Sequence, residues 1–108
     1  MKGFYVDPLN HNRVTVTSAA LVRAVLRDGG QLMQTQEGGW RIRAKGQNRT
    51  GMYLVNSRMV RVQLLNRGQI LPTIGTSIWH LTPIGDLYEE RHYYDQLKSM
   101  LKQLKEQR

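Results

Sequence analysis

The segment SRMVRVQLLNRGQILPTIGTSIWHLTPIGD, residues 57–86, decides the expected fold. Apolar residues within 58–66, placed after capping-type residues and before a glycine, predict a short helix. Two short apolar runs, 69–71 and 78–81, flank a turn that contains proline and glycine, so they predict the strands of a hairpin. Thr82 stands before a proline, a combination that caps and opens a further helix.

Upstream of this segment, the sequence predicts two hairpins with a helix between them. In residues 1–16, apolar and polar residues alternate on both sides of a segment rich in turn-forming residues. We expect this region to form a β-hairpin or an N-terminal arm. Residues 19–27 have apolar side chains at helical spacing, with Thr-Ser before them and two glycines after them. Residues 31–45 predict a hairpin whose second half alternates apolar and basic residues. Residues 45–51 then read as a polar, basic loop.

Downstream, residues 86–108 are expected to form a long C-terminal helix, because acidic residues gather near its start and basic residues near its end. Several apolar residues in it fall on heptad a and d positions: Leu87, Tyr94, Leu97, Leu101 and Leu104. These residues predict a coiled-coil dimer interface. The alternative, in which the helix folds back on its own domain, stays open.

Charge is concentrated in the middle of the chain. Lys and Arg number 16 against 8 Asp and Glu, which gives a net charge of +8. No acidic residue lies between Glu37 and Asp86, whereas seven cations do: Arg41, Arg43, Lys45, Arg49, Arg58, Arg61 and Arg67. Such a basic segment attracts polyanions, and nucleic acid is the polyanion we expect.

Two short sequence motifs resemble the second half of a winged-helix DNA-binding domain: LLNRGQI at 64–70 and WHLTPIG at 79–85. In that family a helix closes with a leucine pair and a glycine, and the second wing strand ends in an aromatic-x-Leu-Thr-x-x-Gly phrase. The resemblance implies an α+β fold: a winged helix over 17–85 with extra β-hairpins and a long C-terminal helix. The chain departs from the family in its middle hairpin and in the wing turn, 73–77, which has no Lys or Arg.

The resemblance also implies a nucleic-acid-binding site on the helix 57–67, lying in the major groove of double-stranded DNA. Arginine can form two hydrogen bonds with guanine, and Asn or Gln can form two with adenine. The residues expected to contact bases are therefore Arg58, Arg61, Gln63 and Asn66. Phosphate contacts are expected from Arg41, Arg43, Lys45, Arg49 and Arg67.

No group of residues predicts catalysis. The chain has no cysteine, and its histidines are His11, His80 and His92. Glu89 and His92 are spaced to share a helical face, but a single such pair lacks the partner carboxylates of a metal site. The glycines match neither a phosphate-binding loop nor a dinucleotide fingerprint. We therefore expect no enzyme, no metal and no cofactor.

Two classes of function remain. The first is a DNA-binding transcriptional regulator, which is a homodimer if the heptad residues form the dimer interface. The second is a non-enzymatic interaction module that docks a protein partner or a larger assembly, which the uncharged wing turn favours. No apolar run is long enough to cross a bilayer and the start lacks a secretory signal, so we expect a cytoplasmic protein without a membrane partner.

Overall fold

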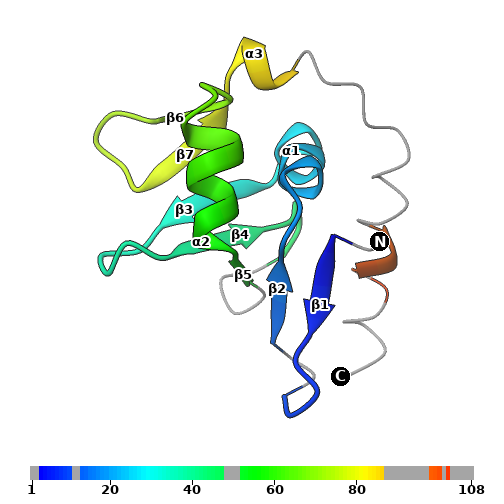
Figure 1. Ribbon diagram of the computed structural model, residues 1–108. Helices are drawn as coiled ribbons and strands as arrows, with labels where there is room; N and C mark the ends of the chain where they lie inside the picture. The colour runs from blue at the N-terminus through cyan, green and yellow to red at the C-terminus, as the bar shows by residue number, and fades with distance from the viewer. Residues whose placement is uncertain (1–2, 11–12, 48–51, 87–97, 101, 103–108) are drawn as a thin grey trace.

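A mixed sheet of seven strands dominates the computed structural model of the chain (Figure 1). The structure describes residues 3–10, 13–47, 52–86, 98–100 and 102. The strands are β1 (Phe4–Val6), β2 (Val14–Val16), β3 (Gln31–Gln34), β4 (Trp40–Arg43), β5 (Tyr53–Val55), β6 (Ile70–Pro72) and β7 (Ile78–Leu81). The helical segments are α1 (Ala19–Arg27), α2 (Ser57–Met59), the π-helix η2 (Val60–Leu65) and α3 (Pro83–Asp86).

The strands lie in the order β1-β2-β5-β4-β3-β7-β6. Three antiparallel hairpins, β1–β2, β3–β4 and β6–β7, lie where the sequence predicts hairpins. The β5–β4 and β3–β7 pairs are also antiparallel, whereas β2 and β5 run parallel. Three consecutive hairpins are thereby joined into one sheet.

Strand β5 makes this continuity possible, and the sequence did not predict it. It pairs with β2 on one side and with β4 on the other, so it links the N-terminal hairpin to the middle hairpin. Tyr53 and Val55 are buried, and Leu54 between them is only partly buried. Alternation of apolar and polar residues over only three positions does not distinguish a strand from a loop.

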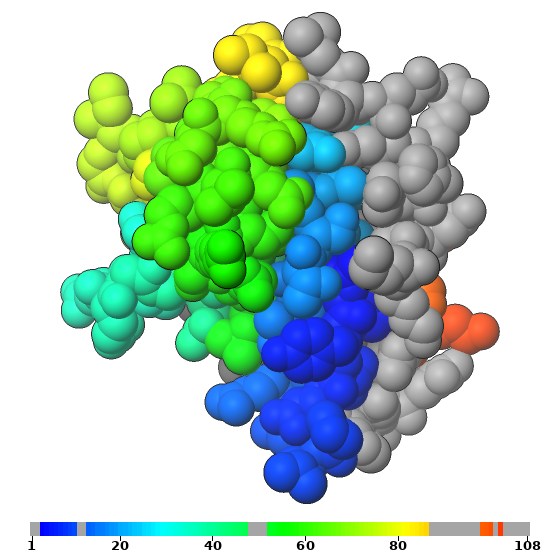
Figure 2. All heavy atoms as spheres, in the orientation of Figure 1, coloured from blue at the N-terminus to red at the C-terminus, as the bar shows by residue number. Residues whose placement is uncertain are grey.

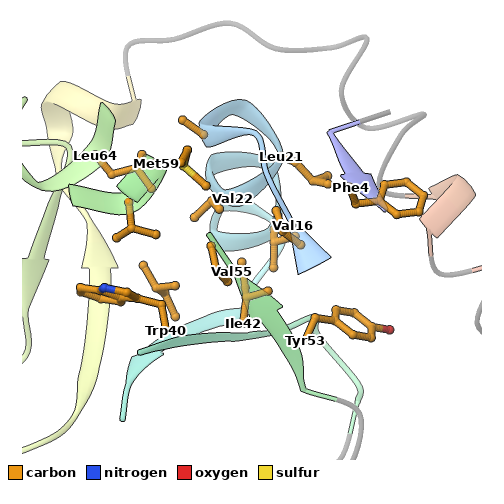
Figure 3. Close-up of a cluster of buried hydrophobic side chains, with 14 of the residues drawn as sticks. Phe4, Val16, Leu21, Val22, Trp40, Ile42, Tyr53, Val55, Met59 and Leu64 are labelled. Carbon is orange, nitrogen blue, oxygen red and sulfur yellow. The ribbon is translucent and has the colours of Figure 1, made fainter. Parts of the chain in front are cut away.

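One face of the sheet is covered by α1 and by the α2–η2 helix (Figure 3). Val22 of α1 lies on the side of Met59 and Leu64, and Leu21 lies on the side of Phe4, above side chains from the sheet. The strands contribute residues that alternate toward this layer: Phe4, Val14, Val16, Leu32, Trp40, Ile42, Tyr53 and Val55. The core therefore lies between the helices and one face of the sheet.

The second helical segment lies where the sequence predicts a helix, but most of it is not an α-helix. Its first turn, α2, is an α-helix, and η2 is a π-helix. The apolar pairs at 59–60 and 64–65 are spaced five residues apart, which fits hydrogen bonds between residues i and i+5. This spacing explains why the apolar residues form no single stripe at the period of an α-helix.

The predicted fold class, a winged helix with extra β-hairpins and a long C-terminal helix, is wrong. The longest helix among the described residues is α1, with 9 residues, and the sheet organises the molecule. The prediction failed because β5 and the pairing of β3 with β7 merge the hairpins into a single sheet, whereas the sequence suggested separate additions to a helical domain. No described helix is long and apolar enough to cross a membrane.

The expected helix over 86–108 has little counterpart in the described part of the chain. Helix α3 covers Pro83–Asp86, and beyond it only residues 98–100 and 102 are described. Met100 is fully buried in the core cluster that also contains Phe4. The predicted dimer residues Leu87, Tyr94, Leu97, Leu101 and Leu104 lie outside the described residues.

Candidate nucleic-acid interface

The exposed side of the α2–η2 helix carries most of the residues predicted to read bases. Asn56 caps this helix, because its Oδ1 accepts a hydrogen bond from the Met59 amide at 2.9 Å. Met59, Val60 and Leu64 are buried and attach the helix to the core. The polar residues of the segment are exposed and form what we call the helix surface: Arg58, Arg61, Gln63, Asn66 and Arg67.

The π-helical winding broadens the helix surface. The Asn66 amide donates to the Arg61 carbonyl at 2.9 Å, a bond that spans five residues. Because each turn is wider than an α-turn, the consecutive residues 61–63 are all exposed. In Figure 2 this segment, drawn in green, lies on the outside of the molecule facing the viewer. Short π-helical segments occur frequently at functional sites.

A shallow pocket of about 280 Å³ lies beside the first turn of this helix. It exists because β2 and β5 are parallel, so Thr17 and Asn56, which follow them, meet at one edge of the sheet. The lining consists of Thr17, Asn56, Arg58, Met59, Val62 and Gln63. Its hydroxyl, amide and guanidinium groups are the kinds of donor that bind phosphate oxygens.

Arg41 and Arg43 lie on the opposite face of the sheet. Successive side chains of a strand point to opposite faces, and Trp40 and Ile42 of the same strand are buried beneath the helices (Figure 3). The Arg43 guanidinium donates through Nη2 to Oε1 of Gln31, its cross-strand partner. These two cations therefore face away from the helix surface.

The seven cations of the acid-free middle segment thus form no single surface. Arg58, Arg61 and Arg67 lie on the helix surface, and Arg41 and Arg43 lie across the sheet from them. Lys45 is exposed after β4, with its aliphatic chain close to Gly29. Arg49 lies outside the described residues. One stretch of duplex cannot contact both faces of the sheet, so the structure separates residues that the sequence grouped.

The β6–β7 hairpin extends beside the helix without a cation. Its turn is ordered by the Thr73 amide, which donates to the Ile78 carbonyl at 2.8 Å, and by Thr76 Oγ1, which donates to the Thr73 carbonyl at 3.0 Å. Ile74 at the tip is 98% exposed. This hairpin offers apolar contact area but no charge for a phosphate.

The described residues contain no cluster of three His, Cys, Asp or Glu side chains that could hold a metal ion. His80 is exposed, and its Nδ1 lies 3.1 Å from Thr73 Oγ1. His11, Glu89 and His92 lie outside the described residues.

A second pocket, of about 570 Å³, lies between α1 and α3. Arg27 lines it and is held there by Asp86, at 3.0 Å from Nε to Oδ1, and by the Gly85 carbonyl, at 3.0 Å from Nη2. These bonds tie α3 to α1. Arg27 therefore has a structural role in this pocket.

Comparisons of this chain with protein-family models, with curated proteins and with solved structures find no match. The local likeness of residues 57–86 to winged-helix domains is untested by these comparisons and stays a prediction.

Sequence reasoning missed the residues that surround Arg41 and Arg43 on their face of the sheet. They include Met33 of β3 and Leu54 of β5, the direct cross-strand neighbours of Arg41. The alternation of residues 40–43 showed that one face of β4 is basic. It could not show which strands would flank it, because β5 was not predicted.

Proposed function

We propose that this protein binds double-stranded DNA through the helix surface and acts as a DNA-binding regulator in the cytoplasm. The observation that carries the proposal is the exposure of three arginines, a glutamine and an asparagine along one helix and the turn that follows it, with the helix anchored by its apolar residues. Arginine can bond guanine with two hydrogen bonds, and Asn or Gln can do so with adenine. The helix surface thus carries both kinds of base-reading side chain.

Charge supports the same proposal. No acidic residue occurs from 38 to 85, so nothing within that segment neutralises Arg58, Arg61 or Arg67. No described carboxylate lies within ion-pair distance of them; the ion pair among the described residues joins Arg27 and Asp86. Exposed guanidinium groups of this kind contribute phosphate attraction as well as base contacts.

Arg41 and Arg43 have no part in this proposal, because they lie on the other face of the sheet. A dimer formed through the predicted heptad residues would present two helix surfaces to two half-sites of a duplex. That assembly stays a prediction, since those residues lie outside the described part of the chain.

The test is fluorescence anisotropy with a labelled random duplex at low salt. The variant R58Q/R61Q/R67Q removes three charges from the helix surface. The matched control R13Q/K98Q/K102Q removes three exposed charges elsewhere. We expect the helix variant to weaken binding roughly a hundredfold, since each of the three lost contacts costs about 1 kcal/mol, while the control changes it by less than about threefold.

Two results would contradict the proposal. Equal weakening by both variants would mean that binding follows net charge and not the helix surface. No binding of duplex by the unmodified protein at low salt would exclude DNA as its ligand.

A further inference from the structure

The sheet face opposite the helices carries a row of side chains that crosses six strands. Direct cross-strand partners follow one another from Tyr5 on β1 to Ile78 on β7: Tyr5, Thr15, Leu54, Arg41, Met33 and Ile78. Cross-strand partners point to the same side of a sheet. The same side of the sheet also carries Gln31, Arg43 and His80, two positions along β3, β4 and β7, and Leu71 of β6, the cross-strand partner of His80. The row and these four residues together form what we call the open face.

The helices leave the open face accessible. The core lies on the other side, where α1 and the α2–η2 helix pack on Trp40, Ile42 and Val55. On the open face, Tyr5 is 56% and Leu71 52% exposed, and Arg41, Met33, Leu54 and Ile78 are each partly exposed. Apolar side chains in the middle of a sheet are thus left in contact with water.

The composition of the open face is that of a protein interface. Tyr, Met and Arg are enriched in the centres of such interfaces, whereas Lys, Asp and Glu are depleted. The open face has all three of the enriched types and none of the depleted ones. Arg41 and Arg43 lie at its middle, on β4; Arg41 lies between Met33 and Leu54, and Arg43 lies beside Gln31.

These two arginines lack an anionic partner among the described residues. Arg41 donates through Nη1 to the Trp40 carbonyl at 3.4 Å, and Arg43 donates to Gln31. No described carboxylate lies within ion-pair distance of either one. A guanidinium group presents five N–H donors, so both side chains keep donors for carboxylates.

We propose that the open face docks an acidic, amphipathic segment of a partner protein. Carboxylates of that segment pair with Arg41 and Arg43, and its aliphatic side chains pack on Met33, Leu54 and Ile78. The proposal concerns the face that does not bind DNA in the proposed function, and it holds or fails independently of that function.

Two other occupants fit less well. A second copy of this chain, docked by the same face about a two-fold axis, would bring Arg41 and Arg43 toward their own copies without a carboxylate. Single-stranded nucleic acid stacks its bases on aromatic rings. Here Trp40 and Trp79 pack against each other on the covered side, with ring centroids 5.2 Å apart, and Tyr5 lies on the edge strand.

The test selects binders from a displayed library of random peptides on the unmodified protein. We expect enriched peptides to combine Asp or Glu with aliphatic residues. Their affinity for R41E/R43E should fall by about tenfold or more, because charged pairs at a desolvated interface are strongly coupled. Peptides with Lys in place of the acidic residues should then bind R41E/R43E. The variant K98E/K102E makes the same change in net charge at exposed positions outside both surfaces; it is the matched control and should bind the original peptides as the unmodified protein does.

A second readout avoids the risk that a variant fails to fold. Methyl NMR of the unmodified protein reports Met33 on the open face and Met59 in the core separately. Adding a selected peptide should shift the Met33 methyl signal and leave Met59 unchanged.

Any one of four results would overturn the proposal. The first is selection without acidic enrichment, and the second is peptide binding that perturbs Met59 but not Met33. Binding of oligo(dT) or oligo(U) that is lost in R41E/R43E would identify a single-strand surface instead. Dimerisation in sedimentation that is abolished by Leu54→Ser would identify a second copy as the occupant.

Discussion

Arg23 of α1 donates a hydrogen bond from Nη1 to Oε1 of Gln69, at 2.6 Å, inside the protein. Arg23 is 8% and Gln69 1% exposed, and 46 residues separate them in the chain. The backbone of Gln69 is also bonded: its amide donates to Leu64, and its carbonyl accepts from Thr82. This pair therefore joins α1 to the point where η2, β6 and α3 meet.

Gln69→Leu should destabilise the protein by about 2 kcal/mol, because it removes the oxygen that accepts from a buried guanidinium. The measurement is urea unfolding followed by tryptophan fluorescence. In a double-mutant cycle, R23M/Q69L should cost less than the two single changes combined, with a coupling of about 1 kcal/mol or more. Additive single effects would show that the two side chains are not energetically linked.

Gly30→Ala should destabilise the fold by about 1–3 kcal/mol, since the new methyl group has no space. A Cβ atom at Gly30 would lie 2.4 Å from Val25 Cγ1 and 2.5 Å from the Arg43 carbonyl oxygen. Gly39→Ala is the matched control: its Cβ would have Thr35 Oγ1 as nearest neighbour at 3.3 Å, so we expect a change within about 0.5 kcal/mol. Thermal unfolding compares the two, and an equal effect would contradict the packing of α1 on β4.

Asn56→Ala should cost about 1 kcal/mol, because it removes the bond that caps α2. Ser18 occupies the corresponding position before α1, but its side chain makes no capping bond. Ser18→Ala is therefore expected to change the free energy of unfolding by less than about 0.5 kcal/mol. Urea midpoints of the two variants measure the difference, and a larger loss at Ser18 would refute this assignment of caps.

Arg67→Gln should lower the salt dependence of DNA binding if Arg67 contacts a phosphate. Each phosphate contact contributes about 0.9 to the slope of log K against log salt. Anisotropy titrations between about 50 and 200 mM salt give that slope for the unmodified protein and the variant. Arg13→Gln serves as the control and should leave the slope unchanged. An unchanged slope for Arg67→Gln would remove this residue from the DNA contacts.

Local features of the fold were predictable because they depend on neighbours in the chain. The boundaries of α1 match the expected helix over 19–27. Thr82 accepts the predicted capping bond, from the Gly85 amide at 3.3 Å, and it also donates to the Gly68 carbonyl at 2.6 Å. The exposure of Arg58, Arg61 and Arg67 follows from the buried positions of Met59, Val60 and Leu64 on the same helix.

The sequence predicted which cations share a face, but it did not predict how the faces lie relative to one another, and the reason is physical. The sequence could place Arg41 and Arg43 together on one face of a strand, since side chains alternate with period two. It could not place that face relative to the helix surface. The side on which a strand buries its apolar residues depends on where helices distant in the chain pack.

By itself, then, the sequence determined the three hairpins, helix α1, the presence of a capping residue before the second helix and the basic character of the middle segment. Tertiary structure decided that β5 and the β3–β7 pair join the hairpins into one sheet, that the second helix is wound as a π-helix, and that the cations separate onto opposite faces. Turns, caps and alternation are set by contacts within a few residues. Strand order and the choice of buried face are set by packing between segments that the chain brings together only when it folds.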